Sequence, residues 1–126
     1  MPLVKIKSLP FAQEVNIPQV LNVLTQALSE ASKIELRHVM ATWDYLTPHH
    51  YAHGGKHVET QPECTHPILV HFIAPNFNSE DEIAAMLELI ASTLAEQLPV
   101  DKRNVFINYS PAYSDGVFDE GHIVAW

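Results

Sequence analysis

The sequence contains only one cysteine, Cys64, and so cannot form an internal disulfide. A chain without disulfides suits a reducing compartment, and we therefore expect a cytoplasmic protein. No stretch approaches the roughly 20 apolar residues that a membrane-spanning helix requires. The first seven residues alternate apolar side chains with lysines, which differs from the basic start and long apolar run of a signal peptide. We expect no membrane partner.

Basic residues are also scarce. The chain has seven Lys and Arg against 15 Asp and Glu, with a formal net charge of -8. Nucleic-acid binding needs clustered Lys and Arg, and here they are scattered, so we expect no nucleic-acid partner. A length of 126 residues predicts a single domain spanning 1–126.

The first half, about 2–46, is patterned as strand, helix, strand. A strand is predicted over Leu3–Leu9, and Asn16 is a good N-cap for a helix that ends near Ser32 and Lys33. Apolar residues recur at helical spacing in between. A second strand is predicted over Leu36–Trp43.

The second half, about 67–112, repeats this order. A strand is predicted over Ile68–Ala74, Ser79 and Glu82 form a capping box for a helix that Pro99 stops, and Asn104–Tyr109 is the last strand. The two halves also align. Pro2–Val4 matches Pro67–Leu69, and His38–Trp43 matches Asn104–Tyr109. Internal duplication of a right-handed β-α-β unit explains this match. The alternative is a chance similarity between two ordinary β-α-β units.

Two segments fall outside the repeat. Residues 47–65 are polar and histidine-rich, and Gly54-Gly55 predicts a hairpin turn there. The C-terminal segment carries a turn at Asp119–Gly121 between Val117-Phe118 and Ile123-Val124. The predicted fold is therefore α/β (α+β), with a four-stranded sheet, two helices on one face, and short hairpin and C-terminal strands. The other face of such a sheet needs cover, so we expect an oligomer.

Met1-Pro2 at the start of the first strand, the duplicated unit and the stretch Asp101–Tyr109 resemble the tautomerase superfamily. Within it, the likeness is greatest to the macrophage migration inhibitory factor and 5-carboxymethyl-2-hydroxymuconate isomerase families. It also extends to a bacterial branch that shares the closing Val117–Asp119 and Gly121-His122 pattern.

This resemblance implies a cofactor-independent tautomerase in which the initiator methionine is removed. The freed amine of Pro2 would then act as general acid and base. It also implies a substrate-binding Lys33, a pocket asparagine at Asn108, and a homotrimer with sites at subunit boundaries, with a dimer as the alternative. Phe106 stands where the family often has a pocket tyrosine, and a hydroxyl is lost there.

The residues themselves give Pro2 a chemical rationale. A free α-amine has a reference pKa of roughly 7.7 to 8, and burial or nearby cations such as Lys33 and Arg37 would lower it. The same cations would suit a carboxylate or an enolate. In the structural alternatives, Pro2 only begins an edge strand, Lys33 and Arg37 are solvated charges at a helix end, and Asn108 only satisfies backbone groups.

Other residues leave alternatives open. Trp43 and Tyr109, equivalent in the repeat, are either pocket walls or core and interface aromatics. His71 in the central strand is expected to be a packed, hydrogen-bonded residue. The insertion histidines favour an exposed polar hairpin over a metal site because no HExxH helix or cysteine pair accompanies them, so we expect no metal. The resemblance implies that no cofactor is needed. The remaining functional alternative is a non-catalytic oligomeric protein that binds a small ligand at its subunit interface.

Overall fold

The computed structural model describes all residues 1–126. Two long helices, two short 3₁₀ turns and eight strands follow one another along the chain. In order they are β1 (Leu3–Ser8), α1 (Ile17–Ser32), η1 (Leu36–His38), β2 (Met40–Tyr45), β3 (Ala52–His53), β4 (Lys56–His57), β5 (Ile68–Pro75), α2 (Glu80–Gln97), η2 (Lys102–Asn104), β6 (Val105–Ala112), β7 (Val117–Asp119) and β8 (His122–Val124).

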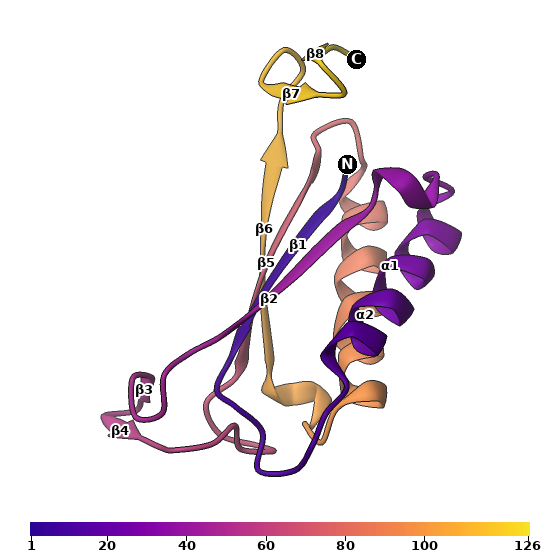
Figure 1. The fold of residues 1–126 in the computed structure, drawn as a ribbon. Helices are drawn as coiled ribbons and strands as arrows, with labels where there is room; N and C mark the ends of the chain where they lie inside the picture. Colours follow the sequence, from indigo (N-terminus) through magenta and orange to yellow (C-terminus); the bar gives the residue numbers. More distant parts are fainter.

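The main sheet has four strands in the order β2-β1-β5-β6. Each half contributes one parallel pair, β1 with β2 and β5 with β6, and the two halves meet through the antiparallel pair β1 and β5. Both helices lie side by side on one face of this sheet (Figure 1). The predicted fold class is therefore confirmed.

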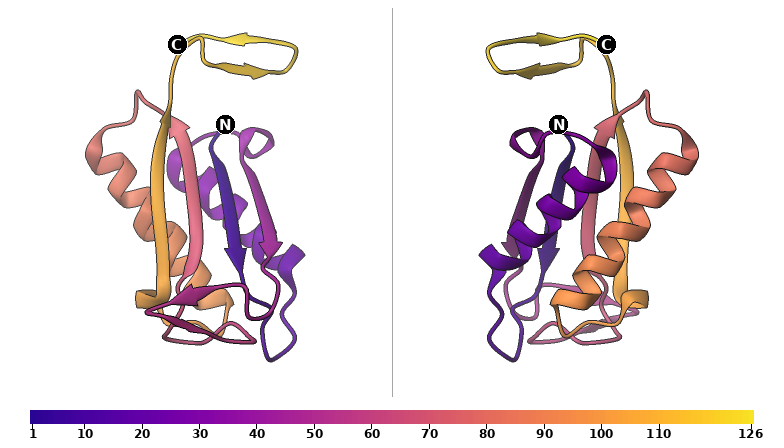
Figure 2. Two further views of the ribbon diagram at one scale, coloured as in Figure 1. Left: turned by 90° about the vertical axis from the view of Figure 1, so that its left-hand side faces the viewer. Right: turned by 90° about the vertical axis from the view of Figure 1, so that its right-hand side faces the viewer.

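Alternation along the strands decides which residues form the core. The side chains that point toward the helices are buried; they are Val4 and Ile6 of β1 and Val70 and Phe72 of β5. Lys5 and Lys7 point to the other face and stay exposed. A cluster of 16 buried hydrophobic residues fills the space between the sheet and both helices. The opposite face of the sheet carries no helix (Figure 2).

The strand register supports the duplication and corrects its alignment by one residue at the first strand. Leu3 pairs with Met40 and Leu69 pairs with Phe106, so Leu3 is equivalent to Leu69. The proposed match of Pro2 with Pro67 put residues of opposite faces together, because strand faces alternate at every residue. The match of His38–Trp43 with Asn104–Tyr109 agrees with the register.

The predicted helix starts are confirmed. The Asn16 side-chain oxygen accepts a hydrogen bond from the Gln19 N–H, and Ser79 and Glu82 form the reciprocal capping box. Helix α1 ends at Ser32, and Lys33 adopts a left-handed conformation with φ of 60°.

Two strand starts were wrong, and the strands predicted to end at Trp43 and Tyr109 continue to Tyr45 and Ala112. Leu36–His38 and Lys102–Asn104 form 3₁₀ turns, and the strands begin only afterwards, at Met40 and Val105. In the second turn, the Asp101 side chain accepts a hydrogen bond from the Arg103 N–H, which favours a turn over an extended start. No helix of the structure is long and apolar enough to span a bilayer.

Candidate active site

Pro2 lies immediately before β1 and is fully buried. Its carbonyl accepts a hydrogen bond from the Met40 N–H at 3.0 Å, which fixes it against the start of β2. The preceding residue, Met1, is only partly buried and lines a pocket of about 330 Å³. Removal of Met1 would therefore leave the Pro2 nitrogen as the chain's amine next to this pocket.

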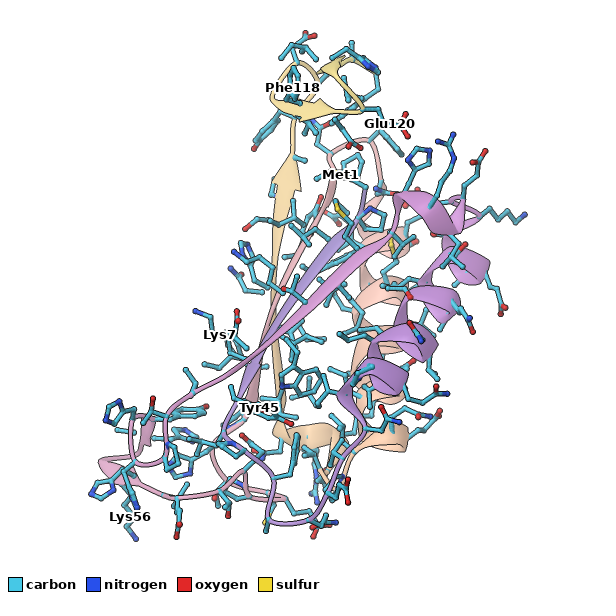
Figure 3. The ribbon with its side chains drawn as sticks, in the orientation of Figure 1. Met1, Lys7, Tyr45, Lys56, Phe118 and Glu120 are labelled. Carbon is cyan, nitrogen blue, oxygen red and sulfur yellow. The ribbon has the colours of Figure 1, made fainter.

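We call this cavity the N-terminal pocket. The C-terminal hairpin β7-β8 forms one side of it, and the chain between α1 and β2 contributes Ile34 and His38. Figure 3 shows Met1 below the hairpin, with Glu120 at the hairpin turn. The other lining residues are Pro75, Phe77, Val117, Asp119, His122, Val124, Ala125 and Trp126. The pocket thus combines an apolar wall with two carboxylates and two imidazoles.

Local contacts explain the position of the hairpin. Gly121 has a φ of 84°, as a tight turn between two short strands requires, and Glu120 before it also has a positive φ. The Trp126 ring nitrogen donates a hydrogen bond to the Asn76 side chain at 2.8 Å, and the Trp126 ring packs edge-on against Phe77. The predicted turn at Asp119–Gly121 is confirmed.

The electrostatics of the pocket act on the chain's amine in two directions. Burial lowers the pKa of the Met1 α-amine below its usual value, and this is the largest effect. The carboxylates of Asp119 and Glu120 oppose it because a negative charge stabilises the ammonium form. The hairpin thus contributes charge as well as shape to the surroundings of the amine.

The two predicted cations do not line this pocket. Arg37 is 63% exposed and pairs with Glu35 at 2.7 Å and with Glu120 at 2.8 Å, and these carboxylates raise its pKa. The pair with Glu120 ties the hairpin turn to the first half of the chain. Lys33 lines a different depression, between the end of α1 and the start of α2.

Asn108 and Phe106 lie together, but far from Pro2. Both point to the open face of the sheet and line a shallow depression of about 330 Å³ together with Lys5, Lys7, Leu69, Val70 and His71. We call this depression the sheet-face groove. Asn108 is at the level of Lys5, which lies about 10 Å along the strand from Pro2, and two strand spacings add roughly another 10 Å. One chain therefore does not bring Asn108 to Pro2.

The third predicted residue of β6, Tyr109, lies on the helix side of the sheet. Its ring packs against Phe72 with centroids 5.9 Å apart, and Trp43 occupies the equivalent position in β2. Trp43 donates a hydrogen bond to the Ser8 hydroxyl at 3.0 Å. Both aromatics thus pack against the core, on the face opposite to Asn108.

The histidine-rich segment forms the short hairpin β3-β4 at the opposite end of the sheet from the N-terminus (Figure 1). His49 and His57 share a hydrogen bond between their Nδ1 atoms at 3.0 Å, and His66 is buried with Nε2 at 2.8 Å from the Lys56 carbonyl. Nowhere do three or more His, Cys, Asp or Glu side chains gather as a metal site would require. His71 in β5 bonds to the Ser110 hydroxyl at 2.8 Å.

Several residues of these two cavities were not anticipated from the sequence. Asp119, Glu120 and His122 come from the hairpin, and His38 from the turn before β2. Lys5 and Lys7 belong to the sheet-face groove. Strict alternation of lysines with apolar residues in the first strand was the available signal for the last two, because it places both on one face of a sheet.

The sequence matches no known protein-family model and no curated protein. Solved structures, in contrast, are similar over almost the whole chain. A protein inactivated by 2-oxo-3-pentynoate has a TM-score of 0.84 at 16% identity, covering 98% of this chain and 95% of the other. A fused 4-OT that forms an asymmetric trimer has a TM-score of 0.82 at 15% identity, covering 96% and 94%.

Macrophage migration inhibitory factor from Oncomelania hupensis has a TM-score of 0.77 at 10% identity, covering 98% of this chain and 97% of the other. The TM-scores establish the shared fold, whereas identities this low leave the activity open. The chain therefore has the fold of the tautomerase superfamily, as the resemblance of Pro2 and the duplicated unit predicted, at a large sequence distance from these proteins.

Proposed function

We propose that the chain, after removal of Met1, is a cofactor-independent tautomerase that acts on a small keto or enol carboxylate. The observation that carries this proposal is the position of Pro2. It is buried immediately before β1 and directly follows Met1, which lines the N-terminal pocket. The fold shared with 4-OT and macrophage migration inhibitory factor supports it. A cytoplasmic location stays a prediction.

The chemistry needs one group that both accepts and donates a proton. The Pro2 amine in its neutral form would remove the proton from the carbon next to the carbonyl, and the electron pair would move to the carbonyl oxygen to give the enolate. The resulting prolinium would return the proton to that oxygen, which completes the ketone-to-enol conversion. Burial lowers the pKa of the Met1 α-amine, and the same effect on the Pro2 amine of the processed chain would favour the neutral base that general-base catalysis requires. The exchange is redox-neutral and consumes no co-reactant.

The separation of Asn108 from Pro2 supports an oligomer. If Asn108 is to donate a hydrogen bond to the substrate oxygen, it must come from a second copy of the chain. The open face of the sheet, which carries Asn108 and has no helix over it, is available for such contact (Figure 2). Because a fused 4-OT of this fold forms a trimer, we propose a homotrimer, with a dimer as the alternative.

The decisive experiment compares Pro2→Ala with Pro67→Ala. Pro67 also precedes a strand of the sheet, but its nitrogen is a peptide nitrogen in every form of the chain. Intact mass spectrometry first establishes that Met1 is absent, and ketone-enol conversion of an arylpyruvate is then followed by absorbance. We expect Pro2→Ala to lower kcat by about 10²- to 10⁴-fold. Pro67→Ala should retain activity. Lack of activity in the demethionylated wild type over a panel of keto acids would contradict the proposal.

Phe106 favours one alternative, a non-catalytic protein that binds a ligand at its subunit interface. This residue is 56% exposed in the sheet-face groove, and its ring offers no hydroxyl to a substrate oxygen. A retained methionine would make the Pro2 nitrogen an amide, which is not basic. Intact mass of untagged protein from the native host discriminates between the two functions, since retention of Met1 excludes the amine mechanism.

A further inference from the structure

The N-terminal pocket has no free cation for a substrate carboxylate. No Lys or Arg lines it. Its ionisable lining groups are the carboxylates of Asp119 and Glu120, the amine of Met1 and two histidines. Arg37 pairs with Glu120 and is also held by Glu35. A carboxylated ligand would therefore meet negative charge in this pocket, and its positive partner must come from elsewhere.

The sheet-face groove has the opposite charge. Strand register places two parallel rows of side chains across the open face. One row runs from Lys5 through His71 to Asn108, and the other from Lys7 through Leu69 to Phe106. The lysines lie on the same strand two residues apart, or roughly 7 Å. Two cations, an amide and an aromatic ring thus line one depression, as recognition of a small organic anion requires.

Neither lysine forms an ion pair within the chain. The five ion pairs of the structure involve other cations. The acidic residue nearest in register is Asp44, the cross-strand neighbour of Lys7, and His71 forms its hydrogen bond with Ser110. If a second copy covers this face, both lysines lose solvent, and Asp44 beside Lys7 is one carboxylate for two cations. Burial of unpaired charge is unfavourable, and a bound anion would relieve it.

We propose that the sheet-face groove binds the carboxylate of a small organic acid. Lys5 and Lys7 are its charge partners, Asn108 is a hydrogen-bond donor, and Phe106 is the wall for an apolar body. One further step rests on the proposed function: in the oligomer, these lysines hold the carboxylate of a substrate whose proton is transferred by Pro2 of a second copy. Lys5 and Lys7 then take the role that the sequence assigned to Lys33 and Arg37.

The test separates binding from turnover by measuring calorimetric binding in a Pro2→Ala background. Phenylpyruvate and pyruvate serve as anionic probes, and 1-phenylpropan-2-one serves as the neutral ketone. Lys5→Gln and Lys7→Gln should each raise the dissociation constant of phenylpyruvate about tenfold. Lys56→Gln is the matched control, because it removes the same charge from the distant hairpin β3-β4, and it should change nothing. Lys7→Arg should restore most of the affinity of Lys7→Gln, and size-exclusion chromatography confirms that each variant assembles.

Three outcomes would overturn the inference. They are no binding of either anionic probe, equal binding of the neutral ketone, or a dissociation constant that Lys5→Gln and Lys7→Gln leave unchanged. With Pro2 intact, Lys7→Gln should raise KM and leave kcat nearly unchanged. The two proposals fail separately. Full activity of Pro2→Ala rejects the tautomerase mechanism and leaves the binding result standing. Loss of activity in Pro2→Ala, together with binding that does not depend on the lysines, rejects only the proposal that the sheet-face groove binds the carboxylate.

Discussion

The two β-α-β halves share a strand register and differ in what precedes and follows it. In the first half, β1 begins at the chain end, and β2 leads into the histidine-rich segment 47–65. In the second half, β5 begins after that segment, and β6 continues into the hairpin β7-β8. The hairpin of the second half then lies over the start of the first (Figure 1).

This difference shows which parts of the molecule are scaffold and which carry the candidate chemistry. The repeated elements supply the sheet, both helices and the core. The features that suggest function are departures from the repeat: the terminal position of Pro2, the acidic turn of the hairpin, and the lysines of β1 where β5 has His71 and Ile73. Each departure occurs once, so its effect can be compared with the equivalent position in the other half.

The largest effect is expected at a pair of equivalent core positions, Ile6 and Phe72. Both side chains are fully buried, and Phe72 also packs against Tyr109. Phe72→Ala should lower the free energy of unfolding by about 3 to 5 kcal/mol, and Ile6→Val by about 0.5 to 1.5 kcal/mol. Urea unfolding at equal protein concentration measures both, because assembly adds to apparent stability. A similar loss in the two variants would contradict the placement of Phe72 at the centre of the core.

A smaller effect should follow from the hairpin turn. The Glu120 carboxylate raises the pKa of the Met1 amine, and we expect it to act in the same direction on the Pro2 amine of the processed chain, so Glu120→Gln should lower that pKa. The neutral base then persists to lower pH, and the acidic limb of the kcat/KM profile should move to lower pH. Glu59→Gln removes an exposed charge from the histidine-rich segment and should leave the limb in place. A shift to higher pH would contradict the assigned direction.

Most of the fold follows from local patterns in the sequence. Alternation in β1 and the caps at Asn16 and Ser79 gave the element types correctly, because both depend on nearby residues. The 3₁₀ turns at Leu36–His38 and Lys102–Asn104 were missed, since apolar and polar order alone does not separate such a turn from the start of a strand. Strand ends depend on pairing with a distant partner.

The candidate site was less predictable, for the same reason. Asn108 and Phe106 belong to one groove, but their separation from Pro2 follows from strand order, which the sequence pattern does not give. The hairpin covers the N-terminus through contacts of Trp126 with Asn76 and Phe77, far apart in the sequence. Such contacts become evident only when the chain is folded.

The smallest expected effect compares the two helix starts. At α2, Ser79 accepts a hydrogen bond from the Glu82 N–H, and the Glu82 carboxylate accepts one from the Ser79 N–H; at α1, Asn16 forms a single such bond. The double variant Ser79→Ala with Glu82→Ala removes both bonds and should therefore lower the free energy of unfolding by about 1 kcal/mol, and Asn16→Ala should lower it by about half as much. Chemical unfolding at neutral pH measures both.

Acid should reduce this difference. The backbone hydrogen bond from Ser79 is the main cause that lowers the pKa of Glu82 from its usual value of 4.5. A carboxyl with a lowered folded-state pKa stabilises the protein above its unfolded pKa, and that contribution is lost as pH falls through the folded value. Below a pH of about 4.5 the wild type loses the contribution of the Glu82 carboxylate, which the double variant already lacks. The penalty of the double variant should thus shrink toward that of Asn16→Ala, since the Asn16 amide does not titrate. A gap that stays constant through this range would mean that the hydroxyl of Ser79, and not the carboxylate of Glu82, makes the second helix start stronger than the first.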